Sequence, residues 1–119
     1  MILMDPPWKE YSKRAENLKN YVDKDKFKPW NLGEIASLKL HKISSTPTFL
    51  FLWCGSDHLL EARTLFNKWG FKRCEDVVWV KTNKKRQFTT KNTDDKSIFQ
   101  KVTEHCLVGL SGDVRRASD

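Results

Sequence analysis

The sequence predicts an α/β domain whose mainly parallel sheet is flanked by helices. Three observations favour this fold class: short apolar runs alternate with a helical pattern, these runs are rich in aromatic residues, and charged segments separate them. The 119 residues suffice for one compact domain but not for two of ordinary size. We therefore interpret residues 1–119 as one domain or part of one.

The first half of the sequence predicts one strand and one short helix. The strand spans residues 2–4 and ends abruptly, because the two prolines after Asp5 have no backbone N–H to donate. Residues 9–30 are mostly charged without a clean period, which favours a long surface loop with at most one helical turn. Asn31 and Glu34 have the spacing of a weak capping box and predict a helix of about two turns.

Three apolar runs in the second half predict the remaining strands. Residues 48–53 are apolar and aromatic, which indicates a strand buried on both faces. Residues 74–81 and 104–110 are interpreted as two more buried strands. Two of these apolar runs and the helix between them each contain a tryptophan that we expect to lie in the core: Trp53, Trp69 and Trp79.

A helix is expected between the strands at 48–53 and 74–81. Ser56 or Asp57 can cap its start, and Gly70 is well placed to end it. Its apolar positions are spaced by three, four and three residues: Leu59, Ala62, Phe66 and Trp69. Residues 82–103 are interpreted as a basic loop, within which residues 96–101 could form a short helix.

Charge and composition narrow the functional classes only slightly. The 22 basic residues outnumber the 15 acidic ones, and the formal charge of +7 favours a polyanionic partner without identifying it. The three cysteines form no CxxC pair, so we expect reduced, buried thiols, no disulfide and no metal. No apolar stretch approaches membrane-spanning length, and we expect a soluble, intracellular protein.

The histidines give no catalytic signal. His105 lies on an apolar strand, where a hydrogen-bonded core histidine is expected rather than a base. His41 and His58 have no visible partners in the sequence, and we assign them no role.

The segment Asp5-Pro6-Pro7-Trp8 lies at the carboxyl end of the first expected strand, where ligands gather in open α/β sheets. Its residues suit the methylation of adenine N6, an amine whose lone pair is delocalised into the ring. The Asp5 carboxylate and the Pro6 carbonyl can accept the two amine hydrogens and turn the lone pair toward an electrophilic methyl group. The prolines hold that carbonyl, and Trp8 offers a flat surface for the purine.

We therefore predict that all four residues are catalytic and that Asp5 also faces the methyl donor. The alternative is a simple strand-ending turn, with Asp5 as a turn former and Trp8 packed on the surface.

Five segments in this order resemble the messenger-RNA adenosine N6 methyltransferase family: residues 5–8, 49–53, 68–71, 75–84 and 104–109. The resemblance covers essentially the whole chain. It implies a Rossmann-like S-adenosylmethionine-dependent methyltransferase fold, S-adenosylmethionine as methyl donor, nuclear localisation and a homologous methyltransferase subunit as heterodimer partner.

Within that family, residues 53–56, 73–76 and 114–119 are more similar to the methyltransferase-like protein 14 branch than to the main catalytic branch. The former is usually the RNA-binding scaffold, and its animal members have an altered acidic-Pro-Pro motif. Asp5 and Trp8 are retained here, so an active site and a relic both remain open. Because the family's C-terminal donor-binding segment has no counterpart, we interpret the chain as a fragment, incomplete at its C-terminus.

The resemblance also suggests which residues bind nucleic acid. Residues 9–30 resemble the gate over the adenosine, and residues 84–101 resemble the segment that reaches the partner and borders the RNA groove. Ordinary solvated charge is the alternative for every one of these residues. The candidates are Lys9, Lys13, Arg14, Lys84, Lys85, Arg86, Arg115 and Arg116.

Three functions remain open. The first is a subunit of an RNA adenosine N6 methyltransferase complex, which transfers the methyl group or supports its catalytic partner as an RNA-binding scaffold. The second is a DNA adenine N6 methyltransferase, since contacts to the RNA 2′-hydroxyl cannot be identified in a sequence. The third is a non-enzymatic RNA-binding or regulatory relative, against which the intact motif argues.

Overall fold

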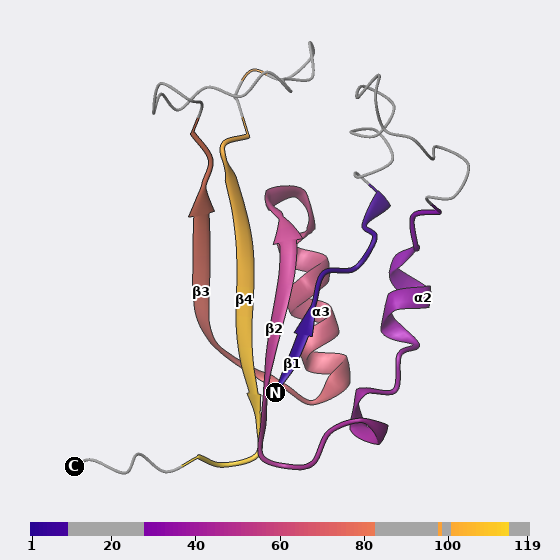
Figure 1. Ribbon diagram of the computed structural model, residues 1–119. Helices are drawn as coiled ribbons and strands as arrows, with labels where there is room; N and C mark the ends of the chain where they lie inside the picture. Colours follow the sequence, from indigo (N-terminus) through magenta and orange to yellow (C-terminus); the bar gives the residue numbers. More distant parts are fainter. Residues whose placement is uncertain (10–27, 83–97, 99–100, 115–119) are drawn as a thin grey trace, which may run out of the picture.

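The computed structural model describes residues 1–9, 28–82, 98 and 101–114 (Figure 1). Within these residues, none of the helices is long and apolar enough to cross a membrane. The strands are β1 (Ile2–Met4), β2 (Thr48–Gly55), β3 (Lys72–Val80) and β4 (Thr103–Ser111). The helices are α2 (Leu32–Ala36) and α3 (Leu59–Trp69), with short 3₁₀ helices η1 (Leu40–Lys42) and η2 (Ser56–His58).

The four strands form one mixed sheet in the order β1-β2-β4-β3. β1 and β2 are parallel, with Leu3 opposite Phe51, whereas β4 is antiparallel to both β2 and β3. The α/β class is confirmed, but the prediction of a mainly parallel sheet is wrong. Consecutive parallel strands need a crossover connection, usually a helix, and the sequence between β3 and β4 carries no clear helical pattern.

Helix α3 packs against one face of the sheet, and β2 shows the effect of that cover (Figure 1). Along β2, Leu50 and Leu52 are fully buried toward the helix, whereas the alternate residue Phe49 remains 39% exposed. The prediction that this strand is buried on both faces is therefore wrong. The core on the covered face joins Leu50 and Leu52 to Ile35, Leu40, Cys54, Ala62, Leu65, Phe66, Phe71 and Leu107.

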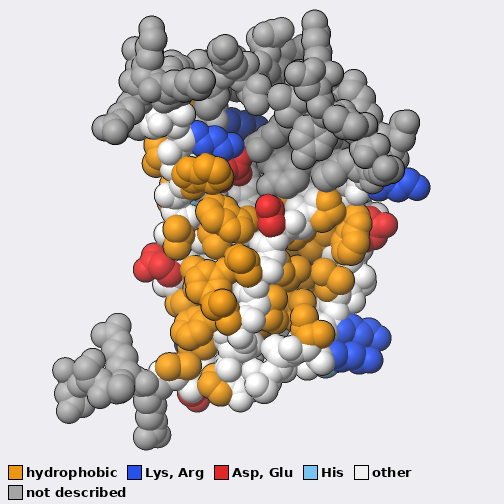
Figure 2. All heavy atoms as spheres, in the orientation of Figure 1, with side chains coloured by type: hydrophobic (Ala, Val, Ile, Leu, Met, Phe, Trp, Pro, Cys, Tyr) orange, Lys and Arg blue, Asp and Glu red, His pale blue; other side chains and the backbone are white. Residues whose placement is uncertain are grey.

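The other face of the sheet carries an exposed layer of apolar side chains, which Figure 2 shows gathered over the strands. Trp79 on β3 is 59% exposed, and Val77 and Leu3 are exposed as well. The strand at 74–81 was placed correctly, but its predicted burial and a core position for Trp79 are wrong. The reason is its position, because β3 lies at the edge of the described sheet. A bulge interrupts its pairing between Arg73 and Glu75.

The helix ends follow the sequence signals with one exception. Asn31 and Glu34 form a full capping box at α2, which is shorter than the expected two turns. Gly70 ends α3 with a left-handed φ of 76°, as predicted. The start of α3 differs: Ser56 and Asp57 belong to η2, and the cap position is taken by His58.

Strand β4 comes close to α3 at Gly109. A Cβ atom at this position would lie 2.2 Å from Cε1 of Phe66, so only glycine fits without movement of the ring. The predicted burial of 104–110 is confirmed for most of the strand. Of the cysteines, Cys54 and Cys106 are buried as expected, but Cys74 is exposed because it lies on the edge strand β3.

Candidate functional site

The motif at residues 5–8 lies at one end of the strands. β1 and β2 are parallel and both end there. β4 begins at that end and pairs antiparallel with both β2 and β3, so β3 ends there as well. Asp5 directly follows β1 and is exposed. The structure therefore places the motif at the carboxyl ends of three strands, where open α/β sheets bind ligands.

The backbone of the motif forms a tight turn with defined hydrogen bonds. The Pro6 carbonyl accepts a hydrogen bond from the Trp8 backbone N–H at 2.8 Å, and the Pro7 carbonyl accepts one from the Trp30 N–H at 2.9 Å. A carbonyl oxygen has two lone pairs, so the Pro6 oxygen retains capacity for a second donor. The role of Asp5 and Pro6 in orienting an amine stays a prediction.

Trp8 lies inside the protein rather than on its surface. Its side chain is only 1% exposed, and its indole Nε1 donates a hydrogen bond to the Trp53 carbonyl at 2.8 Å. One face of the indole stacks on His58, with ring centroids 4.9 Å apart and planes 13° from parallel. The flat surface expected for a purine is covered in this arrangement, so base stacking would require the ring to move. That role stays a prediction.

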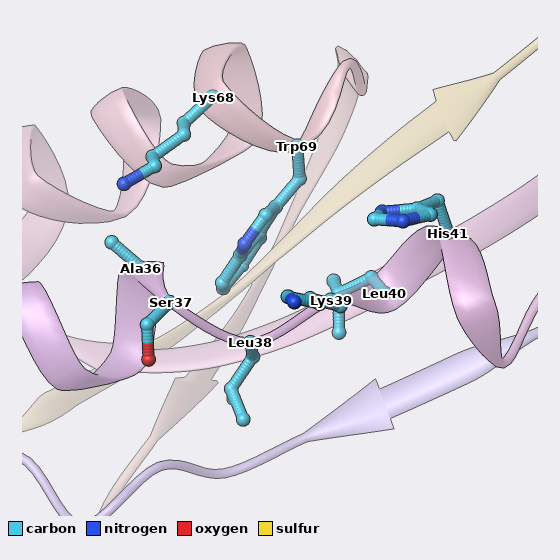
Figure 3. Close-up of a pocket in the computed structure, with 8 residues that line it drawn as sticks. All are labelled: Ala36, Ser37, Leu38, Lys39, Leu40, His41, Lys68 and Trp69. Atoms are coloured by element: carbon cyan, nitrogen blue, oxygen red, sulfur yellow. The ribbon is translucent and has the colours of Figure 1, made fainter.

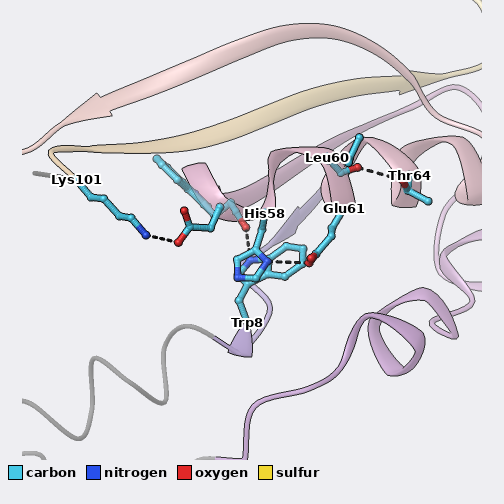
Figure 4. A network of polar contacts seen from close by, with 8 residues as sticks. Trp8, His58, Leu60, Glu61, Thr64 and Lys101 are labelled. Carbon is cyan, nitrogen blue, oxygen red and sulfur yellow. Dashed lines mark hydrogen bonds and ion pairs between the residues drawn. The ribbon is translucent and has the colours of Figure 1, made fainter. Parts of the chain in front are cut away.

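His58 has two partners that the sequence analysis missed. Besides the Trp8 ring, its Nδ1 lies 2.7 Å from Oε2 of Glu61 (Figure 4). Glu61 is in the first turn of α3, so a His and Glu three residues apart at a helix start were the available signal. The expectation that His58 lacks partners is therefore wrong.

Two charged pairs lie at the same end of the sheet as the motif. Glu104, a buried residue at the start of β4, accepts a hydrogen bond from Lys81 at 2.5 Å, and Lys101 pairs with Asp57. A dashed line from Lys101 in Figure 4 marks this ion pair. These partners are 23 and 44 residues apart, so no local sequence signal marks them.

His105 and Cys106 occupy neighbouring positions on β4. The Nδ1 of His105 lies 3.0 Å from Oδ2 of Asp76, which confirms the predicted hydrogen-bonded histidine. Burial raises the pKa of the Cys106 thiol, and the negative charges of Asp76 and Asp5 raise it further. At neutral pH this thiol is therefore protonated and a poor nucleophile.

Within the ranges that the structure describes, no group of three or more His, Cys, Asp and Glu side chains could hold a metal ion. Of the predicted nucleic-acid-binding residues, Lys9 is described and exposed, directly after Trp8. The other seven lie outside the described residues: Lys13, Arg14, Lys84, Lys85, Arg86, Arg115 and Arg116.

A separate hollow of about 290 Å³ lies where α2 and α3 end, away from the motif (Figure 3). Two lysines, Lys39 and Lys68, line it together with His41 and Trp69. The Trp69 Nε1 is buried, and no described residue accepts a hydrogen bond from it. No pattern in the sequence predicts this hollow.

Comparison with known proteins adds a family match. The family model described as MT-A70 matches residues 1–119. Over 120 aligned residues that cover the whole chain, identity is 46% to the N6-adenosine-methyltransferase non-catalytic subunit MTB of Arabidopsis thaliana. It is 44% and 38% to the N(6)-adenosine-methyltransferase non-catalytic subunit METTL14 of Danio rerio and of Drosophila melanogaster. The chain spans 15%, 25% and 30% of the length of these three relatives, respectively.

Proposed function

Because the chain belongs to the MT-A70 family, we propose that the full-length protein is a subunit of an N6-adenosine methyltransferase complex. In this complex it supports a homologous catalytic subunit, in keeping with its relatives, which are named as non-catalytic subunits. It also binds RNA. The observation that carries the proposal is similarity over the whole chain to such subunits. A nuclear location fits a complex that acts on messenger RNA.

The geometry of the motif supports a scaffold role. Trp8 is buried and stacked on His58, so the described arrangement presents no aromatic surface on which an adenine could stack. The motif then works as a structural turn that joins β1 to the core. The excess of basic residues over acidic ones favours association with a polyanion such as RNA.

A second candidate function, methyl transfer by this subunit itself, is favoured by one observation. Asp5 is exposed at the carboxyl end of β1, and the neighbouring Pro6 carbonyl can still accept a hydrogen bond. Asp5 and Pro6 would accept the two N6 hydrogens of adenine and direct its lone pair away from the ring. When the nitrogen gains its methyl group it also gains a positive charge, and Asp5 is placed to accept the proton that is then released.

The methyl donor implied by the family is S-adenosylmethionine, which supplies an electrophilic methyl group on a positively charged sulfur. The exposed carboxylate of Asp5 fits that charge, and it is the described residue that we assign to the donor. DNA is the alternative substrate, because adenine presents the same amine in both nucleic acids. A non-enzymatic RNA-binding role remains the third reading.

The test uses the full-length protein, alone and with its catalytic partner, on matched adenine-containing RNA and DNA. Asp5→Ala is compared with Asp113→Ala, an exposed aspartate after β4. For a scaffold, we expect the complex to bind RNA and transfer methyl groups equally well with either variant. A loss of about 100-fold or more in kcat for Asp5→Ala alone would assign catalysis to this subunit. A protein that neither binds RNA nor raises the activity of its partner would contradict the proposal.

A further inference from the structure

The side chain of Trp8 is fixed from three sides. The Trp53 carbonyl accepts a hydrogen bond from its indole N–H, the imidazole of His58 covers one of its faces, and core residues surround the rest. A ring that is 1% exposed and both hydrogen-bonded and stacked has little freedom to change its orientation. Figure 4 shows the imidazole and the indole lying against each other.

His58 is itself oriented by the helix that follows it. It occupies the cap position of α3, and its Nδ1 contacts Glu61 in the first turn at 2.7 Å. A carboxylate accepts hydrogen bonds and donates none, so Nδ1 carries the proton and donates to Glu61. This bond selects the ring tautomer and holds the imidazole plane parallel to the indole.

The position of Trp8 also controls the backbone of the motif. The backbone N–H of Trp8 donates a hydrogen bond to the Pro6 carbonyl at 2.8 Å. The two prolines between Asp5 and Trp8 also have restricted φ angles. A shift of Trp8 is therefore transmitted to the direction of the Pro6 carbonyl. This carbonyl is the second amine acceptor in the adenosine site considered above.

We propose that His58, oriented by Glu61, is a positioning residue: it clamps the Trp8 indole and thereby sets the direction of the Pro6 carbonyl beside Asp5. The functional half of this proposal rests on the second candidate function, methyl transfer at Asp5 and Pro6, and not on the scaffold role. The clamp itself does not, because it concerns contacts within the protein. Two separate measurements therefore test the two halves.

The clamp is tested by ¹⁹F NMR of the full-length protein labelled with 5-fluorotryptophan, with Trp8→Phe to assign the Trp8 resonance. We expect His58→Ala to shift this resonance toward that of a solvent-exposed indole and to increase its H₂O/D₂O isotope shift. His58→Phe keeps a stacking ring and should restore the wild-type resonance. His41→Ala, an exposed histidine beside the separate hollow, is the matched control and should change nothing.

An unchanged Trp8 resonance in His58→Ala would overturn the clamp, and so would a failure of His58→Phe to restore it. Glu61→Ala decides the matter if His58→Ala does not fold. It removes only the bond that orients the imidazole, and we expect the Trp8 resonance to move while those of Trp69 and Trp79 stay in place. No movement of the Trp8 resonance would overturn the clamp in this variant as well.

The functional half is tested by methyl transfer to adenosine in RNA by the complete complex. If Asp5→Ala lowers kcat, we expect His58→Ala to lower it by about 10- to 100-fold, as a misplaced acceptor would. His58→Phe should restore it, and RNA affinity should not change. Full activity in His58→Ala with a displaced Trp8 would overturn the positioning role. No effect of Asp5→Ala would overturn the adenosine site and this half together, whereas the NMR result would still decide the clamp.

Discussion

On the α3 side of the sheet, Leu50 and Leu52 of β2 are fully buried, whereas on the opposite side Phe49 of the same strand is 39% exposed. Trp79, the largest apolar side chain of β3, is exposed on that same opposite side of the sheet. Both faces carry residues of the type that usually fills a core. Along β2, the difference shows that burial is decided by which face helix α3 covers, not by the kind of residue.

The sharpest test of this difference is a pair of substitutions on one strand. Leu52→Ala removes a fully buried side chain and should lower the free energy of unfolding by about 2–5 kcal/mol. Phe49→Ala on the other face should lower it by about 0.5–1.5 kcal/mol, since its described contact is with the Phe51 ring. Both are measured by urea unfolding of the full-length protein. Equal losses would mean that the open face is covered in that protein.

A smaller effect is expected from filling space on the covered face. Gly109→Ala places a methyl group 2.2 Å from the Phe66 ring and should cost about 1–3 kcal/mol of unfolding free energy. Gly33→Ala in α2 is the control, because the nearest atom to its Cβ is the end of the Asn31 side chain at 3.2 Å. It should change stability by less than about 1 kcal/mol. Similar losses in both variants would contradict the close approach of β4 to α3.

The smallest effect concerns the cysteines and pH. The pKa of Cys106 is raised by burial and by Asp76 and Asp5, so the folded protein holds this proton more tightly than the unfolded chain. The contribution of this thiol to the free energy of unfolding is fully present below its ordinary pKa of 9.0. It is lost as the pH rises from there through the higher pKa that the thiol has in the folded protein. Between pH 8 and pH 10, about one unit on each side of that pKa, the free energy of unfolding should therefore fall less for Cys106→Ala than for the wild type.

Alkylation of the native protein provides an independent check of the same environment. The exposed thiol of Cys74 should react first, and Cys106 should react only slowly. Reaction of Cys106 at the rate of Cys74 would contradict the burial of β4.

The elements with local signals were predictable from the sequence. The capping box at Asn31 and Glu34 and the left-handed Gly70 follow from chemistry within a few residues, and both are confirmed. The strands were also found because their apolar runs are short and well separated. Their pairing was not found, because parallel and antiparallel neighbours share the same residue types.

The candidate site was predictable only in part, for a similar reason. The sequence placed Asp5 at a strand end correctly, but Trp8 was expected to be accessible and is buried. Its burial depends on the Trp53 carbonyl and the His58 ring, which are 45 and 50 residues away. Nothing within the motif itself indicates contacts of that range.

The bulge between Arg73 and Glu75 has a consequence for how separate molecules would meet. The first half of β3 contains this irregularity and carries the charges of Lys72, Arg73, Glu75 and Asp76. Such features discourage a second sheet from adding a strand. The second half, from Val77 to Val80, is regular and apolar. Unwanted strand addition should therefore begin at these four residues, and a single lysine there should suppress it.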